Sequence, residues 1–217
     1  MKIGILGGTF DRIHEGHLTL ARAAREQFSL GKILFIPAFI PPHKAARRDL
    51  TPAPYRYRMV ELAIKGEPAF EISDVELNRP DVSYTVDTLR ALKMKYPQAG
   101  LFLIVGSDTL AEIPHWREPE EIARLATILV ARRFSPHPVP LPLRGRGEAA
   151  RRASLARGRG EGTDVHWIEM PGCPISSSAI REAIRQGRPL EKGVLPQDVE
   201  DYIRKMKLYE KEPWTLS

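Results

Sequence analysis

The sequence predicts an α/β fold whose centre is a doubly wound parallel sheet. Short apolar runs alternate with helical patterns along the whole chain, and the runs are rich in Ile, Leu and Val without clear polar alternation, as expected for strands covered on both faces. Such alternation of strand and helix favours parallel strands joined by right-handed crossovers. A length of 217 residues with 42% hydrophobic content suits one domain around one substantial core.

Six short aliphatic runs qualify as strands, and six longer segments have the apolar spacing of helices. The strands are Lys2–Leu6, Ile33–Ile36, Phe70–Ser73, Leu101–Val105, Thr127–Ala131 and His166–Glu169. The helices are Leu18–Phe28, Ala53–Lys65, Val86–Lys95, Glu118–Ala126, Ala179–Gln186 and Gln197–Lys207. The last two helices form a C-terminal helical segment at about 176–209, and we expect residues 1–217 to form a single domain.

The loop after the first strand has the composition of a phosphate site. Residues 7–17 are Gly-Gly-Thr-Phe-Asp-Arg-Ile-His-Glu-Gly-His. A glycine-started loop that leads into a helix N-terminus offers N–H groups and the positive end of the helix dipole to an anion. His14 and His17 add side chains that can carry positive charge, and Gly16 removes a side chain that would block the anion. In a doubly wound sheet ligands bind where this loop lies, beyond the carboxyl ends of the strands.

Other interpretations of this loop fit less well. The chain has no Gly-Lys-Ser/Thr of a Walker A loop, and Gly4-Ile-Leu-Gly7-Gly8 lacks the spacing of a dinucleotide fingerprint. His14 and His17 are close enough in sequence to chelate zinc, but the metalloprotease pattern His-Glu-x-x-His is missing. A structural role for both histidines is also open. Neither the zinc site nor the structural role explains the glycines.

Cysteine usage and hydropathy indicate a cytoplasmic protein. Cys173 is the single cysteine, so no intramolecular disulfide is expected and a reducing compartment is favoured. The apolar run before Gly7 is too short for a signal peptide, and no run reaches the length that spans a bilayer. We therefore expect no association with a membrane.

The net charge of +6 is concentrated in one segment. Between Ser135 and Gly162 there are six arginines against two glutamates, so this segment carries four of the six net positive charges. We expect a basic insertion at about 137–163, an exposed loop or short helix between strands. No aromatic residues are interleaved with the arginines to stack on bases, so a solvated surface is favoured over a nucleic-acid site. The sequence is also compatible with a homo-oligomer held by these arginines.

Two motifs at opposite ends of the chain carry a resemblance to a known superfamily. Gly7-Gly8-Thr9-Phe10-Asp11-x-x-His14-x-Gly16-His17 resembles the Gly-x-Phe-Asp-Pro-x-His-x-Gly-His signature of the nucleotidyltransferases. Ile175-Ser176-Ser177-Ser178-Ala179-Ile180-Arg181 resembles their second signature, Ile-Ser-Ser-Ser/Thr-x-x-Arg. The resemblance implies the Rossmann-like nucleotidyltransferase fold.

The middle of the chain resembles the bacterial nicotinate-nucleotide adenylyltransferase branch. The matching segments are Pro41-Pro42-His43-Lys44, Ser83-Tyr84-Thr85-x-Asp87-Thr88-Leu89, Gly106-Ser107-Asp108 with Trp116 downstream, Leu195-Pro196 and Val199–Tyr209. The resemblance covers nearly the whole chain except the basic insertion. It implies transfer of AMP from ATP to nicotinate mononucleotide, which gives nicotinate adenine dinucleotide and pyrophosphate in NAD biosynthesis.

The resemblance also implies roles for individual residues. His14 and His17 would hold the α-phosphate and leaving oxygens during direct in-line attack, without a covalent intermediate. The ATP-binding residues would be Gly7, Gly8, Thr9, Phe10, Lys44, Gly106, Asp108, Ser177, Ser178 and Arg181. The acceptor-binding residues would be Tyr84, Thr85, Trp116 and the backbone at Arg117. Mg²⁺ would arrive with ATP, because no acidic cluster forms a dedicated cage for a metal.

Each of these residues also has a purely structural interpretation. Lys44 would then be an ordinary exposed lysine, and Tyr84 and Trp116 would be core residues. Asp108 would cap the short helix that follows it. Ser177 and Ser178 would supply a plain serine N-cap for the helix Ala179–Gln186, and Arg181 would face the solvent.

Arg12 departs from the signature, which has proline at this position. Proline stiffens a loop, so arginine would either loosen the loop or bring another cation near the phosphates.

Two other functions remain as alternatives. One is an adenylyltransferase for another phosphate acceptor such as phosphopantetheine, and the other is a noncatalytic protein that binds nucleotides or RNA.

Overall fold

The computed structural model describes residues 1–42, 50–131, 164–170, 180, 182–184, 186–189, 191 and 193–209. The strands are β1 (Lys2–Gly8), β2 (Lys32–Pro37), β3 (Phe70–Ile72), β4 (Gly100–Gly106), β5 (Thr127–Ala131) and β6 (Val165–Ile168). The α-helices are α1 (Glu15–Phe28), α2 (Ala53–Ala63), α3 (Thr85–Lys95), α4 (Ser107–Leu110), α5 (Pro119–Leu125) and α8 (Gln197–Lys205). A 3₁₀ helix, η2, covers Ile113–His115. The predicted basic insertion lies outside the described residues, as do residues 179, 181 and 185 of the predicted helix Ala179–Gln186, whose residues 180 and 182–184 are helical.

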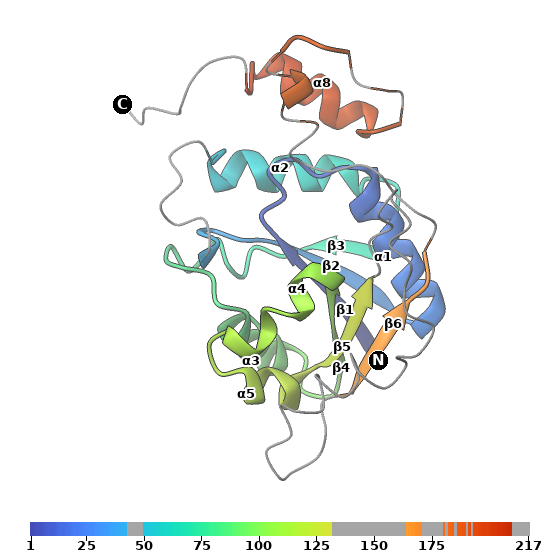
Figure 1. The fold of residues 1–217 in the computed structure, drawn as a ribbon, viewed down its shortest axis with the longest axis vertical. Helices are drawn as coiled ribbons and strands as arrows, with labels where there is room; N and C mark the ends of the chain where they lie inside the picture. The colour runs from blue at the N-terminus through green and yellow to red at the C-terminus, as the bar shows by residue number, and fades with distance from the viewer. Residues whose placement is uncertain are drawn as a thin grey trace.

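The strands form one parallel sheet, as predicted. The order is β3-β2-β1-β4-β5-β6 (Figure 1), and β1 pairs in parallel with β2 on one side and β4 on the other. The strand order reverses between β1 and β4, which makes the carboxyl ends of these two strands the switch point of the sheet. This arrangement confirms the doubly wound fold.

Alternate residues of β1, β2, β4 and β5 belong to two separate cores. Leu6 and Ile104 belong to the first core, which contains residues of α1, α2 and α8. Ile5 and Leu103 belong to the second core, which contains residues of α3 and α5. Figure 1 shows α2 between the sheet and α8. The long aliphatic runs are therefore explained by burial on both faces of the sheet.

The observed boundaries differ from the predicted ones near the switch point. Helix α1 begins at Glu15, three residues before the predicted start at Leu18. The prediction began too late because the first turn is polar and lacks the apolar spacing that marks the rest of the helix. Strand β1 continues through Gly8, because Gly7 and Gly8 pair with Ile36 and Pro37 of β2. None of the helices in the described ranges has the length and apolar character that crossing a bilayer requires.

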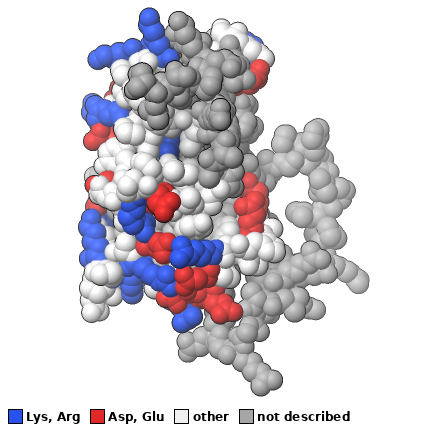
Figure 2. Space-filling view, turned by 90° about the vertical axis from the view of Figure 1, so that its left-hand side faces the viewer, with Lys and Arg blue, Asp and Glu red and all other residues white. Residues whose placement is uncertain are grey.

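The outer surface of α3 and α5 carries charges of both signs. Arg90 bonds to Glu118, and Arg117 lies 3.5 Å from Asp87 and 3.8 Å from Glu118. Figure 2 shows Lys and Arg interspersed with Asp and Glu over this part of the molecule. Exposed pairs of this kind stabilise a fold by only about 0–1 kcal/mol each. This surface therefore has no single sign of charge that would favour a nucleic acid.

The close packing of β1 against the first core gives a prediction for Gly4. A Cβ atom at Gly4 would lie 2.5 Å from Cδ1 of Ile33, 2.8 Å from Cδ1 of Leu30 and 3.2 Å from Cδ1 of Ile104. We expect Gly4→Ala to lower the free energy of unfolding by about 1–3 kcal/mol, because the buried neighbours must shift. Urea denaturation measures this change.

Gly100→Ala on β4 is the matched control for Gly4. Its Cβ would meet only the ring edge of Phe102, at 3.4 Å, so we expect a much smaller change. Equal losses for the two variants would contradict the role of close packing.

Candidate active site

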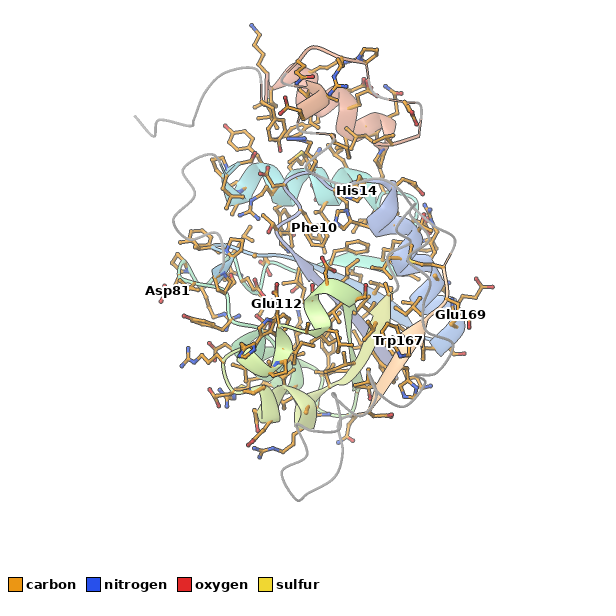
Figure 3. The ribbon with its side chains drawn as sticks, viewed as in Figure 1. Phe10, His14, Asp81, Glu112, Trp167 and Glu169 are labelled. Carbon is orange, nitrogen blue, oxygen red and sulfur yellow. The ribbon has the colours of Figure 1, made fainter. Side chains whose placement is uncertain are left out.

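The loop between β1 and α1 lies at the switch point of the sheet. It leaves β1 at Gly8 and enters α1 at Glu15. Figure 3 shows Phe10 and His14 in this region, near α2 and the start of α1. On the other side of the switch point, β4 ends at Gly106, and α4 follows at once with Ser107 and Asp108. The ATP-binding residues predicted after β1 and those predicted after β4 thus lie at the same edge of the sheet.

Phe10 anchors the loop from inside. Its φ of 46° lies in the left-handed region that non-glycine residues seldom adopt. The buried ring contacts the edge of His17 with 5.2 Å between ring centroids, and it lies 6.0 Å from the ring of Phe35 on β2. A Cβ at Gly8 would come within 3.3 Å of the same ring. Because the whole residue is only 3% exposed, the Phe10 ring supports the loop from within and does not offer a face to a nucleotide.

His14 and His17 lie side by side at the N-terminus of α1. Their ring centroids are 3.8 Å apart, and His14 is the N-cap residue with extended backbone. The backbone N–H of His14 donates to Nδ1 of His17 at 3.2 Å. Nδ1 of His17 is therefore an acceptor, so the neutral ring carries its proton on Nε2. His17 can thus present an N–H donor to a phosphate even when it is uncharged.

The N-terminus of α1 is partly occupied by the protein itself. The backbone N–H of Glu15 donates to the carbonyl of Val194 at 3.0 Å. This bond joins the loop between β1 and α1, called the phosphate loop after its predicted role, to the segment that leads into α8. An anion at this helix end therefore shares the first turn with a structural hydrogen bond, which the sequence pattern did not reveal.

Arg56 is a residue of this region that the sequence analysis missed. Its side chain is completely buried, and its guanidinium donates to the carbonyls of Thr51 at 2.7 Å, Thr9 at 2.7 Å and Phe39 at 2.9 Å. Burial lowers the pKa of this guanidinium, while the negative charge of Asp11 raises it. A signal was present in the sequence, because Arg56 shares the apolar face of α2 with four buried residues. They are Ala53, Met59, Val60 and Ala63.

Arg12 contacts the C-terminal segment inside the protein. The side chain is completely buried, and its guanidinium carbon lies 3.8 Å from the ring centroid of Tyr209. The hydroxyl of Tyr209 donates to Oδ1 of Asp11 at 2.9 Å. Arg12 and Asp11 therefore fasten the loop to the C-terminal segment. This contact gives Arg12 a structural role that neither prediction included, while the effect on the loop and the cation near the phosphates stay predictions.

The predicted acceptor residues gather on the opposite face of the sheet from α1. Tyr84 is the N-cap of α3, and Thr85 begins the helix. The Arg117 guanidinium carbon lies 4.9 Å from the Tyr84 ring centroid, and Nη1 of Arg117 lies 3.5 Å from Asp87. Tyr84 and Trp116 are half-buried and pack against the second core. Each has a core contact and an exposed part, so the structural and ligand-binding interpretations are compatible.

The remaining predicted residues have varied positions. Asp108 is exposed in the first turn of α4, and the N-cap of that helix is Gly106, so Asp108 is not the helix cap. Lys44, Ser177, Ser178 and Arg181 lie outside the described residues. Within the described part of the chain, no three His, Cys, Asp or Glu side chains form a group that could hold a metal ion.

Comparisons with known proteins agree over the length of the chain. Residues 5–183 match the cytidylyltransferase-like family. A probable nicotinate-nucleotide adenylyltransferase from Geotalea uraniireducens (strain Rf4) is 42% identical over 220 residues, covering 96% of this chain and 98% of that protein. Another, from Moorella thermoacetica (strain ATCC 39073 / JCM 9320), is 40% identical over 209 residues, covering 96% of this chain and 91% of that protein.

A solved structure shares the fold at lower identity. The nicotinic acid mononucleotide adenylyltransferase of Plasmodium falciparum, complexed with NaAD, matches with a TM-score of 0.74. The match covers 97% of this chain and 98% of that chain at 20% sequence identity. At this level of identity the likeness shows a common fold.

The contact between Tyr209 and Asp11 gives a prediction for stability. We expect Tyr209→Phe to lower the free energy of unfolding by about 1–3 kcal/mol, because it leaves a buried acceptor without its donor. Urea denaturation at pH 7 measures the loss. Tyr202→Phe on α8 removes a hydroxyl from the same segment without involving Asp11 and is expected to have a smaller effect.

The loss caused by Tyr209→Phe should also depend on pH. Burial raises the pKa of the Tyr209 phenol, and the negative charge of Asp11 raises it further. A group whose pKa is higher in the folded state stabilises the fold fully below its unfolded pKa and loses this effect as pH rises. The difference between wild type and variant should therefore shrink above about pH 10, the ordinary pKa of tyrosine. A constant difference up to pH 11 would contradict this account.

Proposed function

The chain belongs to the cytidylyltransferase-like family and, within it, to the nicotinate-nucleotide adenylyltransferases, and we propose that it transfers AMP from ATP to nicotinate mononucleotide. The products are nicotinate adenine dinucleotide and pyrophosphate, in NAD biosynthesis. The observation that carries the proposal is the pair His14 and His17 at the N-terminus of α1, at the switch point of the sheet.

The reaction is an in-line substitution at the α-phosphorus of ATP. A phosphate oxygen of nicotinate mononucleotide forms the new bond to the α-phosphorus, and pyrophosphate leaves with the electron pair of the broken bond. The attacking phosphate is already ionised at neutral pH, so no general base is required. Catalysis then depends on positioning and on donors that meet the charge of the transition state.

The two histidines are suited to stabilising this charge. The hydrogen bond from the His14 N–H to Nδ1 of His17 leaves Nε2 of His17 as the donor. The Phe10 ring and the adjacent His14 ring restrict the orientation of His17, so little reorganisation is needed when charge develops on the phosphate. We propose that both rings contact the α-phosphate and the departing oxygen.

The other groups of ATP would be held by the loops after β1 and β4 and by two segments that carry charged or hydroxyl side chains. We propose that Gly7, Gly8, Thr9 and Gly106 accept the nucleotide by backbone contacts, and that Asp108 bonds to a ribose hydroxyl. Lys44, Ser177, Ser178 and Arg181 would hold the β- and γ-phosphates. ATP enters as its Mg²⁺ complex, in which the ion neutralises part of the pyrophosphate charge.

The acceptor site would lie at the start of α3. The first-turn N–H groups at Thr85 can bind the nicotinate carboxylate, and the Trp116 ring offers a face to the pyridinium. The side chain of Arg117 lies beside Asp87 and Tyr84, which leaves its backbone as the group proposed to bind the carboxylate.

A cytoplasmic location is also part of the proposal, because a single cysteine suits a reducing compartment.

The first test is turnover. Purified protein with ATP, Mg²⁺ and nicotinate mononucleotide should release pyrophosphate, and His17→Ala should lower kcat by about 10²–10³-fold, as loss of one preorganised donor does. His166→Ala is the control, because this histidine lies on β6, where its Nε2 is 2.9 Å from Asp164. Absence of pyrophosphate with both nicotinate and nicotinamide mononucleotide would contradict the function. Undiminished turnover in His17→Ala would contradict only the mechanism.

The second test concerns the acceptor. Trp116→Ala should raise the KM for nicotinate mononucleotide roughly 2–30-fold, which corresponds to a cation–π contact of about 0.5–2 kcal/mol, while the KM for ATP stays near the wild-type value. Initial rates with each substrate varied in turn measure both constants. Trp167→Ala removes the exposed tryptophan of β6 and should change neither. If Trp116→Ala raised the two KM values equally, the proposed platform would be wrong.

A further inference from the structure

A continuous line of hydrogen bonds joins the phosphate loop to the acceptor side of the molecule. Nη1 of Arg56 donates to the carbonyl of Thr9 at 2.7 Å, and Nη2 donates to the carbonyl of Phe39 at 2.9 Å. The N–H of Phe39 in turn donates to Oγ of Ser83 at 2.9 Å. Ser83 directly precedes Tyr84 and Thr85, where α3 begins. The peptide groups of Phe39 are thus held from both sides.

The far end of this line is itself anchored. The N–H of Ser83 donates to the carbonyl of Ile40 at 2.9 Å, and Ile40 forms a parallel bridge with Val82. Glu76 is buried and accepts a hydrogen bond from the hydroxyl of Thr88 on α3 at 2.6 Å. Burial raises the pKa of Glu76, while hydrogen bonds from Thr88 and Ser83 lower it. Ser83 is therefore fixed to the loop after β2 and to the first turns of α3.

Arg56 holds the near end rigidly. A guanidinium is a planar fork with fixed donor directions, and the three carbonyls bonded by Arg56 belong to two different connections. Thr9 lies between β1 and α1, whereas Phe39 and Thr51 lie near the two ends of the connection between β2 and α2. Complete burial of this charge is unfavourable in itself. Its three hydrogen bonds offset this penalty. The same bonds fix the relative positions of these loops.

We propose that Arg56 and Ser83 are positioning residues that set the distance between the ATP site and the acceptor site through the backbone of Phe39. This inference rests on the proposed function, because it assigns the phosphate loop to ATP and the start of α3 to the acceptor. In-line attack requires the acceptor phosphate to lie on the line of the breaking bond at a short distance from the α-phosphorus. The bridge fixes this separation without contacting either substrate.

The proposal predicts a particular kinetic pattern. Each substrate is bound by its own loop, so a weakened bridge leaves the individual binding sites in place. The relative placement of the two substrates changes, and a misplacement of about 1 Å can reduce turnover by about 10²-fold. Loss of the bridge should therefore lower kcat while the KM values change little.

The test uses Arg56→Lys, Ser83→Ala and the double variant, with both substrates varied in steady-state assays. Lysine keeps the positive charge but cannot bond to three separated carbonyls. We expect kcat to fall roughly 10–100-fold in each single variant, with both KM values within about 3-fold of wild type. The double variant should lose little more than the worse single variant, because both substitutions break the same bridge.

Two further variants separate positioning from general damage. Arg58→Lys lies on the same helix, where Arg58 is exposed and paired with Glu61, and should behave as wild type. Ser83→Thr keeps the hydroxyl and should restore most of the turnover lost in Ser83→Ala. Urea denaturation of each variant shows whether the protein is folded under assay conditions. If Arg56→Lys does not fold, the comparison of Ser83→Ala with Ser83→Thr decides the question.

The results distinguish this inference from the proposed function. No turnover by the wild-type protein would contradict the function. An active wild type whose Ser83→Ala variant keeps its kcat would overturn the bridge alone. A raised KM for one substrate at constant kcat, multiplicative losses in the double variant, or no recovery in Ser83→Thr would also overturn it.

Discussion

The pairing of β1 with β2 on one side and with β4 on the other is the constraint on which the other features depend. Because both faces of the sheet are covered by helices, polar groups that must meet a ligand can emerge only where the strands end. The connections from β1 and β4 leave toward opposite faces of the sheet. Phe10 of the first connection belongs to one core and Tyr84 at the start of α3 packs against the other, so the two regions proposed to bind the substrates lie on opposite sides of the sheet.

The loops at this edge are ordered by side chains rather than by regular backbone pairing. Phe10 holds a left-handed conformation against the core, and Arg56 bonds to three loop carbonyls. Buried carbonyls that lack a partner are unfavourable, so such loops need donors from elsewhere in the fold. Here the donor is a charged group that also gives the loops a fixed spacing. Stability and function are therefore served by the same hydrogen bonds.

The sequence predicted the six strands and the position of the glycine- and histidine-containing loop after the first strand, because these depend on local apolar runs and on glycine and histidine spacing. It did not predict that α1 begins at Glu15, since the first turn is polar and faces the loop. Arg56 was overlooked although a charge on the apolar face of α2 was a visible signal. The contact of Arg12 with Tyr209 could not be found locally, because the partners come from opposite ends of the chain.

The attachment of Tyr209 to Asp11 has a consequence for the order in which the protein matures. The two residues are separated by 198 positions, so the N-terminal loop is synthesised first but acquires its final support last. A nascent chain can pair β1 with β2 and β4 while this loop still lacks its clamp. The core that contains residues of α8 is completed only when the C-terminal segment docks, so this core and the support of the loop are finished by the same late event.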